Sequence, residues 1–222
     1  MNSKFEEYFS SLKHKKIAVL GLGVSNRPLV RLLLEYGCDV VGCDKTPRDK
    51  LDAEVLALEQ AGCKLHVGEG YLDGVEADIL FRTPGMHPAN PAIEALRSRG
   101  AEVTSEMEAF FEVCPCTILA VTGSDGKTTT TTIVGEMLKR LPVPSAVGGN
   151  IGLALSKEVE SLPQDGWLAA ELSSFQLEKV SSFCPDIAVV LNLTPDHLER
   201  HHTMEAYGEA KKNIFRQQGE VQ

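Results

Sequence analysis

The sequence predicts an α/β protein with parallel sheets, and three observations support this fold class. Short apolar runs alternate with segments of helical spacing along most of the chain. A glycine-rich turn directly follows an apolar run in each half, at Gly21–Asn26 and at Gly123–Gly126. Acidic or polar residues, such as Asp44 and Glu171, then end the apolar runs. Strands that alternate with helices pair in parallel and carry the helices on the faces of the sheet.

The first half is expected to form a complete βα domain, residues 1–113. Its expected strands are 17–20, 39–43 and 78–81, and its expected helices are 29–36, 51–61 and 90–99. Pro91 suits the first turn of the last helix, and Gly100 suits its end. The glycine-rich turn makes this domain Rossmann-like.

The second half, residues 114–222, is expected to be an incomplete α/β domain. Its expected strands are 117–121, 167–172 and 187–191, and its expected helices run from the second glycine-rich turn to about Arg140 and over 204–217. About three strands are fewer than the roughly 4–6 usual in such a sheet. We therefore expect a truncated sheet with an unpaired edge.

Composition narrows the class of protein. The 222 residues are 43% hydrophobic and carry a net charge of -9. Basic residues form no cluster along the sequence that would favour binding of nucleic acid. The six cysteines contain no Cys-x-x-Cys pair, which predicts reduced thiols and mostly small buried residues. Residues 1–16 lack the apolar region of a signal peptide, and no apolar run is long enough to span a membrane. We expect a cytoplasmic protein without membrane or nucleic-acid partners.

The segment Val121–Thr128, with the sequence Val-Thr-Gly-Ser-Asp-Gly-Lys-Thr, predicts a phosphate site. A glycine-rich turn between strand and helix directs backbone N–H groups and the positive end of the helix dipole at one point. Lys127 adds a charge there, and Thr128 offers a hydroxyl to a metal ion. The glycine spacing differs from that of the standard P-loop. Asp125 could bring a negative charge close to the phosphates or cap the helix.

The first glycine-rich turn gives a weaker indication. Gly21-x-Gly23-x-x-Asn26 departs from the dinucleotide fingerprint at its third position, so a simple turn and an anion site both remain open. Asp44 ends the next strand, where dinucleotide folds place a ribose-binding acid. A helix cap or a solvated carboxylate is the alternative.

Further candidates lie at strand ends of the second half. Glu171 could hold the magnesium ion that bridges phosphates. Asn150 lies in a glycine-rich segment, 148–152, that could approach a ligand closely. His197 follows another strand, whereas His201 and His202 are expected to be surface residues.

Together these segments resemble the Mur ligase family, whose members are ATP-dependent amide ligases of peptidoglycan synthesis. Four segments occur in the family's order, and they are Thr122–Thr128, Gly148–Gly152, Glu171–Glu178 and Asn192–Arg200. The form Glu-Leu-Ser-Ser-Phe-Gln-Leu-Glu resembles the branch of the family that adds D-glutamate. The likeness extends over nearly the whole chain.

The resemblance implies roles for individual residues. Catalytic roles fall on Lys127, Glu171, His197 and Lys211. ATP would be bound by Gly123, Ser124, Asp125, Gly126, Lys127, Thr128 and Thr129. Mg²⁺ ions would be held by Thr128, Glu171, His197 and Lys211, the last as a carbamate. The uridine substrate would meet Val24, Ser25, Asp44, Lys45, Thr46, Asn150 and His197.

The implied reaction joins D-glutamate to UDP-N-acetylmuramoyl-L-alanine through an acyl phosphate. The resemblance also implies that the chain lacks the rest of the ATPase domain and a third domain that binds the amino acid. We therefore expect an N-terminal fragment that binds the uridine substrate without forming the amide, from a protein that is monomeric at full length. Another ATP-dependent amide ligase (L-alanine-adding or folylpolyglutamate-forming), a non-catalytic nucleotide-binding module and a fragment of a dinucleotide-dependent oxidoreductase are the alternatives.

Overall fold

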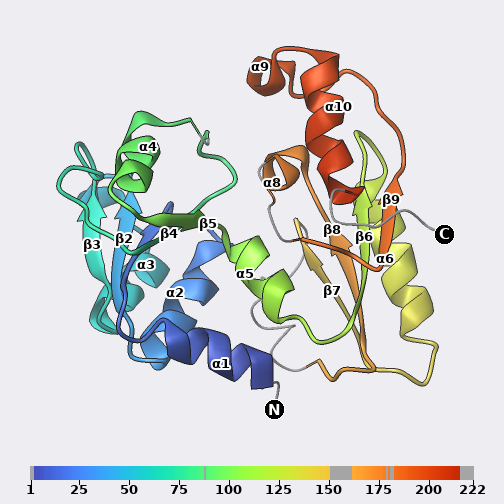
Figure 1. Cartoon of the computed structure of the whole chain (residues 1–222), viewed down its shortest axis with the longest axis horizontal. Coiled ribbons are helices and arrows are strands. Elements are labelled where there is room, and N and C mark those ends of the chain that lie inside the picture. Colours follow the sequence, from blue (N-terminus) through green and yellow to red (C-terminus); the bar gives the residue numbers. More distant parts are fainter. Residues whose placement is uncertain (1–2, 88, 151–161, 179, 181–182, 216–222) are drawn as a thin grey trace. The chain divides into compact units, whose positions relative to one another are not determined.

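A computed structural model describes residues 3–87, 89–150, 162–178, 180 and 183–215 (Figure 1). The chain forms two compact units, which we describe separately. The N-terminal unit is Ser3–Ala109, and the C-terminal unit consists mainly of Phe110–Gln222. Both units contain a parallel sheet with helices, so the predicted parallel α/β fold class is confirmed.

The N-terminal unit is built on a five-stranded parallel sheet with the strand order β3-β2-β1-β4-β5 (Figure 1). Its strands are β1 Lys16–Leu20, β2 Asp39–Asp44, β3 Lys64–Val67, β4 Ile79–Arg82 and β5 Glu102–Thr104. Its helices are α1 Ser3–Ser11, α2 Asn26–Glu35, the 3-10 turn Arg48–Lys50, α3 Ala53–Gln60 and α4 Pro91–Ser98, and α5 Glu106–Val113 continues into the C-terminal unit. Strands β3 and β5, together with α1 and α5, are additions to the elements that the sequence predicted.

Local sequence explains the boundaries of the predicted helices. Asn90 caps α4, because its side chain accepts a hydrogen bond from the Ala92 amide at 2.9 Å, and Pro91 occupies the first turn. Asp52 caps α3 by accepting from the amides of Glu54 and Val55.

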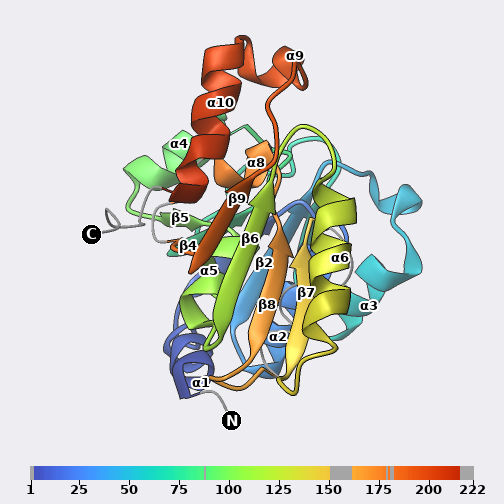
Figure 2. The same cartoon turned by 90° about the vertical axis from the view of Figure 1, so that its right-hand side faces the viewer.

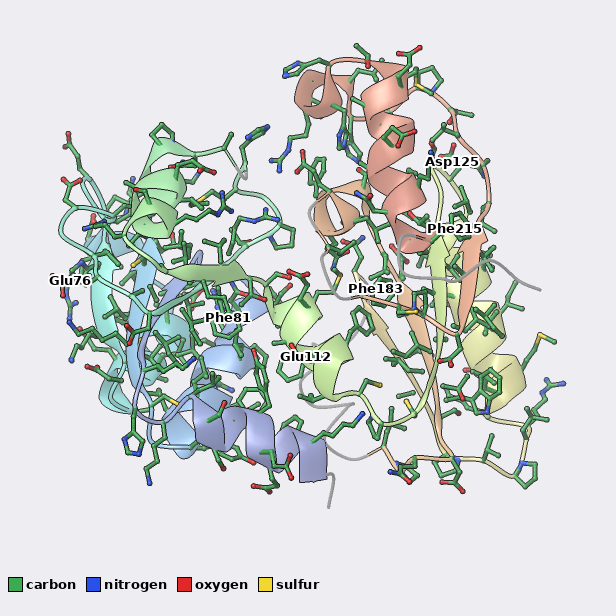
Figure 3. All side chains as sticks on the ribbon, viewed as in Figure 1. Glu76, Phe81, Glu112, Asp125, Phe183 and Phe215 are labelled. Carbon is green, nitrogen blue, oxygen red and sulfur yellow. The ribbon has the colours of Figure 1, made fainter. Side chains whose placement is uncertain are left out.

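The core of the N-terminal unit lies on both faces of its central strands. Every side chain of β4 is buried, and Phe81 is fully enclosed (Figure 3). The aromatic rings of Phe5 and Phe9 on α1 pack against each other with centroids 4.7 Å apart. Phe9 also packs against Tyr36 at the end of α2. These contacts give the polar N-terminal segment a buried apolar face, which explains its helix.

The C-terminal unit contains a four-stranded parallel sheet with the order β7-β8-β6-β9 (Figure 2). Its strands are β6 Thr117–Thr122, β7 Ser145–Gly149, β8 Trp167–Glu171 and β9 Ile187–Val190. The expectation of three strands was therefore wrong. Strand β7 includes Gly148 and Gly149, and glycine is depleted in strands, so the sequence favoured a loop there.

The helices of this unit lie around the sheet. They are α6 Lys127–Leu138, α8 Ser174–Leu177, α9 Leu198–His201, α10 Met204–Lys212 and the 3-10 turn Asn213–Phe215. Helix α6 packs on β7 and β8, and α10 packs on α8 and α9. The helix expected over 204–217 ends at Lys212, and residues 216 and 217 lie outside the described residues. In the described part of the chain, no helix has the length and apolar character needed to cross a membrane.

Candidate functional site

The second glycine-rich turn joins the end of β6 to the start of α6 at the carboxyl edge of the sheet. Gly126 is the N-cap residue and has a φ of 78°, a left-handed conformation that glycine adopts without strain. Its lack of a side chain leaves the first helical turn uncapped. The backbone N–H groups of Lys127, Thr128 and Thr129 belong to the first turn of α6, where an α-helix provides them with no carbonyl acceptor. They therefore form an anion-binding arrangement.

Asn192, which follows β9, fixes the first part of this turn. Its Oδ1 accepts hydrogen bonds from the amides of Ser124 at 3.1 Å and Asp125 at 3.0 Å, and its Nδ2 donates to the Asp125 carbonyl at 3.1 Å. Those two amides are therefore engaged within the protein. The Asp125 carboxylate accepts from the Thr194 hydroxyl at 3.2 Å and does not cap α6.

Two lysine ammonium groups converge on the carbonyls of this turn. Lys127 Nζ donates to Gly123 O at 2.9 Å and to Ser124 O at 2.8 Å. Lys211 on α10 is buried, and its Nζ donates to the same Gly123 oxygen at 2.7 Å. Burial, followed by the charge of Lys127, lowers the pKa of Lys211 to about 8, although Asp196 opposes the shift. Two cationic side chains therefore lie beside the turn, which suits a phosphate site.

Glu171 lies at the end of β8 with only 1% of its surface exposed. Its Oε2 accepts from the Thr128 hydroxyl at 2.8 Å, and its Oε1 accepts from Asn150 Nδ2 at 3.0 Å. Gly149 permits this approach, because a Cβ on Gly149 would lie 2.2 Å from the Glu171 carbonyl oxygen. The structure therefore brings three of the predicted residues, Thr128, Asn150 and Glu171, into direct contact.

His197 lies farther along the chain, at the start of α9. Its side chain is 46% exposed, and its ring nitrogens lie 3.4 Å from Asp196 and 3.5 Å from Glu199. The ring of Phe175 packs against it, with centroids 4.9 Å apart. These contacts connect His197 with its sequence neighbours and with α8, and they do not include Glu171 or Lys211.

The expectation that His201 is a surface residue was wrong, whereas His202 is exposed. His201 is buried, and its Nε2 lies 3.0 Å from the Ser174 hydroxyl. Burial lowers the pKa of His201. The rings of Phe175 and Tyr207 pack against it, so the side chain joins α8, α9 and α10. A helix of four residues gives too little periodicity to show this burial in the sequence.

The donor atoms at Thr128 and Glu171 fit a magnesium ion. A carboxylate and a hydroxyl are hard oxygen ligands, and Mg²⁺ is commonly bound by one or two carboxylates together with waters and substrate phosphates. A second ion at His197 and Lys211 does not fit the residues as they stand, because an ammonium group has no lone pair to offer. Among the described residues, no group of three or more His, Cys, Asp or Glu is arranged to hold a metal ion.

The first glycine-rich turn, in the N-terminal unit, is organised by Asp44. Its carboxylate accepts from the Leu22 amide at 2.7 Å and from the Thr46 amide at 2.9 Å. Partial burial alone would raise the pKa of Asp44, but these backbone N–H groups hold it below its ordinary value. The predicted residues Val24, Ser25 and Lys45 are exposed around this turn, and Val24 is 79% exposed.

Two residues near the turns escaped sequence analysis. Tyr207 is fully buried, and its hydroxyl lies 3.0 Å from the Ser124 hydroxyl. Arg82 ends β4, is 5% exposed, and donates to the Met86 carbonyl at 2.8 Å. A charged residue directly after the apolar run 78–81 was the available indication for Arg82.

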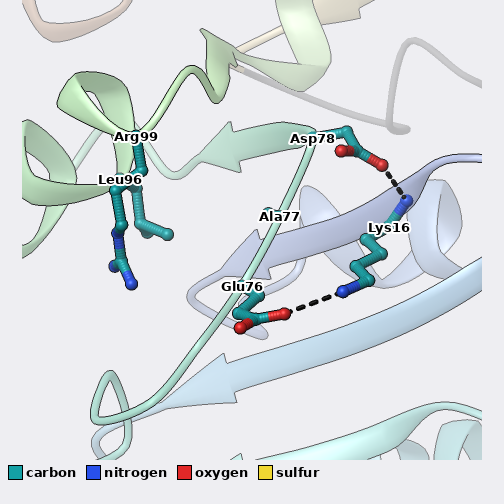
Figure 4. Close-up of a pocket in the computed structure, with 6 residues that line it drawn as sticks. All are labelled: Lys16, Glu76, Ala77, Asp78, Leu96 and Arg99. Carbon is teal, nitrogen blue, oxygen red and sulfur yellow. Dashed lines mark hydrogen bonds and ion pairs between the residues drawn. The ribbon is translucent and has the colours of Figure 1, made fainter.

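A separate pocket of about 250 Å³ lies at the amino ends of β1 and β4 in the N-terminal unit (Figure 4). Its charges are satisfied locally, because Lys16 Nζ pairs with Glu76 at 2.7 Å and the Lys16 amide donates to Asp78 at 2.7 Å (Figure 4). The pocket is at the edge of the sheet opposite the glycine-rich turn, so it is not part of the candidate site.

This combination defines a parallel α/β protein with a candidate phosphate-binding turn at a sheet edge, and comparison with known proteins gives its family. Residues 121–222 match the Mur ligase middle domain. The chain is 48% identical to the UDP-N-acetylmuramoylalanine--D-glutamate ligase of Acetivibrio thermocellus, over 98% of this chain and 47% of that protein. It is 45% identical to the protein of the same name from Clostridium botulinum, over 98% of this chain and 48% of that protein. The chain belongs to the Mur ligase family and spans about half the length of these relatives.

Solved structures agree with this assignment. The UDP-N-acetylmuramate-alanine ligase of Thermotoga maritima superposes with a TM-score of 0.56 at 25% identity, over 91% of this chain and 47% of that one. The UDP-N-acetylmuramate:L-alanyl-γ-D-glutamyl-meso-diaminopimelate ligase of Neisseria meningitides, at 21% identity, superposes with a TM-score of 0.55 over 91% of this chain and 68% of that one. The second likeness supports the fold alone.

Proposed function

We propose that this chain provides the uridine-substrate unit and the phosphate-binding turn of an ATP-dependent ligase that joins D-glutamate to UDP-N-acetylmuramoyl-L-alanine. The observation that carries the proposal is the contact of Thr128 with Glu171 beside the uncapped start of α6. The names of the relatives from Acetivibrio thermocellus and Clostridium botulinum support the choice of substrates.

The phosphates of ATP bind at the first turn of α6. The amides of Gly126, Lys127, Thr128 and Thr129 donate to them, and the ammonium group of Lys127 leaves the Gly123 and Ser124 carbonyls to pair with them. Gly123, Ser124 and Asp125 shape the turn, because Asn192 already holds the amides of the last two. Thr128 and Glu171 would hold Mg²⁺, which would supply charge neutralisation for the phosphates.

The uridine diphosphate group binds at the first glycine-rich turn. Val24 and Ser25 on the turn, together with Asp44, Lys45 and Thr46 after β2, surround it. Lys45 offers a positive charge to the diphosphate. Asn150 and His197 contact the remainder of the same substrate.

The chemistry proceeds in two transfers. A carboxylate oxygen of the alanyl group attacks the γ-phosphorus of ATP, and the bond to the bridging oxygen breaks to give an acyl phosphate and ADP. The amine of D-glutamate then attacks the acyl carbon, inorganic phosphate leaves, and the nitrogen loses a proton. Phosphoryl transfer depends on positioning and on charge neutralisation and needs no covalent bond to the protein. Lys127 supplies the neutralising charge.

Lys211 takes part as a carbamate. Its lowered pKa leaves a fraction of neutral amine at physiological pH, and the nitrogen lone pair of that form attacks the carbon of CO₂ with loss of a proton. The product is an anion, which would make this position and His197 suitable for a second Mg²⁺. Labelled CO₂ should give a carbamate carbon resonance that Lys211→Arg abolishes, and its persistence in that variant would exclude Lys211 as the site.

Titration with Mg·ATP tests the phosphate site, with inorganic tripolyphosphate as a competitor. Lys127→Ala should weaken binding by about tenfold or more, because it removes a charge that pairs directly with phosphate. Lys139→Ala is the matched control, since Lys139 is an exposed lysine near the other end of α6 that pairs with Glu136. Equal affinities for the two variants would refute this site.

A further inference from the structure

A pair of cysteines lies outside the site described above, in the connection from α5 to β6. Cys114 and Cys116 are separated by Pro115, and their Sγ atoms are 3.3 Å apart, within hydrogen-bonding distance. Cys116 is 7% exposed, whereas Cys114 is more accessible. The connection belongs to no strand, because residues 114–116 have irregular backbone. The side chains of both cysteines can therefore rotate without disturbing the hydrogen bonds between strands.

The two thiols differ in reactivity. The hydrogen bond from Cys116 lowers the pKa of Cys114, although burial opposes the shift. The same contact, together with burial, raises the pKa of Cys116. By contrast, burial raises the pKa of Cys43 to about 12 and that of Cys63 to about 11. Because the thiolate is the nucleophile, Cys114 has the character of an attacking thiol and Cys116 that of its partner.

We propose that Cys114 and Cys116 form a reactive dithiol that small external disulfides, such as oxidised glutathione, convert to an internal disulfide. The thiolate of Cys114 attacks one sulfur of the external disulfide, forming a mixed disulfide and releasing one thiolate. Cys116 then loses its proton and attacks the Cys114 sulfur, which releases the second thiol. Two protein thiols are oxidised, and one disulfide is reduced to two thiols.

The geometry suits the second step. The sulfur atoms need to close from 3.3 Å to the length of a disulfide bond, about 2.05 Å, over a distance that side-chain rotation can supply. Neighbouring thiols at this separation make the internal attack faster than a second encounter with an external thiol. The mixed disulfide is therefore short-lived in the unmodified chain.

The experiment incubates the whole chain with oxidised glutathione, blocks remaining thiols by alkylation and identifies each cysteine by peptide mass spectrometry. The unmodified chain should lose two hydrogen atoms from the peptide that contains Cys114 and Cys116, and dithiothreitol should reverse the loss. Cys116→Ser should retain glutathione on Cys114. Cys114→Ser should incorporate glutathione at Cys116 at least about tenfold more slowly, because that thiol is buried and protonated.

Cys184→Ser serves as the control, since Cys184 is exposed and lies outside the pair. It should leave disulfide formation unchanged, and circular dichroism should show that all three variants are folded. A stable glutathione adduct on Cys114 in the unmodified chain, or no adduct on Cys114 in Cys116→Ser, would overturn the proposal. Modification restricted to Cys184 would overturn it as well.

Discussion

At the scale of single residues, the candidate site combines one buried carboxylate with two cations. Glu171 uses both of its carboxylate oxygens, one for Thr128 and one for Asn150, whereas Lys127 and Lys211 donate to the same carbonyl oxygen. The predictions at this scale therefore concern charge and protonation.

Glu171→Gln should remove the magnesium-dependent part of ATP affinity. The amide can still accept from Thr128 at similar volume, but it is a much weaker ligand for Mg²⁺ than a carboxylate. We expect binding to weaken by roughly tenfold with Mg²⁺ present and to change little with EDTA. Glu136→Gln, on the exposed face of α6, is the control. A loss of affinity that is the same with and without Mg²⁺ would contradict the assignment.

As the free amine, in buffer without CO₂, Lys211 should make stability depend on pH. Its pKa is lowered from 10.5 to about 8, first by burial and then by the charge of Lys127. Between these values the unfolded chain binds a proton that the folded chain does not, so the free energy of unfolding increases as pH rises. This penalty is fully present below about pH 8 and is relieved above it.

Urea unfolding from about pH 7 to 10 checks this, with Lys211→Met as the reference. The unmodified chain should gain on the order of 1–3 kcal/mol relative to the variant as pH rises over this range. Parallel stability curves for the two proteins would show that Lys211 keeps an ordinary pKa.

At the scale of secondary-structure elements, the site depends on the end of β7. Gly149 has a φ of 102°, and a Cβ there would lie 2.2 Å from the Glu171 carbonyl oxygen. Gly149→Ala should therefore lower the free energy of unfolding by about 2 kcal/mol or more in addition to the cost of backbone strain. Gly100→Ala separates the two effects, because Gly100 has a φ of 99° and open space around its Cα.

Thermal unfolding of both glycine variants measures this difference, and the affinity for Mg·ATP gives a second readout. Gly149→Ala should also weaken Mg·ATP binding, since Asn150 and Glu171 would move apart. Equal destabilisation by the two substitutions would mean that the close approach of β7 to β8 is unimportant.

Sequence predicted those elements whose own residues carry the pattern. Helix α4 has its cap, its proline and its terminal glycine, and the apolar strands β1, β4 and β6 are continuous runs. Strand β7 was missed because its glycines allow a close contact with β8. A contact between strands that are distant in the chain cannot be seen in the sequence of β7 alone. Helix α1 was missed because its aromatic face is buried by tertiary packing, for example of Phe9 on Tyr36, which its own residues do not show.

The candidate site was predictable to a similar degree. Thr128 and Glu171 follow two predicted strands, so parallel topology let the sequence place them at the same edge of the sheet. The position of Asn150 beside Glu171 was not predictable in this way, because it follows β7, which the sequence did not predict as a strand. The roles of Asn192 and Tyr207 could not be predicted, because both act through contacts between residues that are distant in the chain. The burial of His201 likewise depends on the packing of α8 and α10 around it.

At the scale of the whole molecule, each unit presents a glycine-rich turn at the carboxyl edge of its own parallel sheet. The N-terminal turn is held by Asp44 and the C-terminal turn by Asn192. Ligands of such sheets bind at this edge. Two such turns in one chain agree with the proposed ligase, which uses both ATP and a uridine-linked substrate.

The most direct test of this account is a calorimetric titration of the chain with UDP-N-acetylmuramoyl-L-alanine, with NAD as the comparison ligand. We expect saturable binding of the uridine compound, at least about tenfold tighter than that of NAD. Asp44→Asn should weaken it, because the charge that orders the turn is lost. Preference for NAD, or no binding of the uridine compound by a chain whose circular dichroism shows it to be folded, would contradict the proposed function.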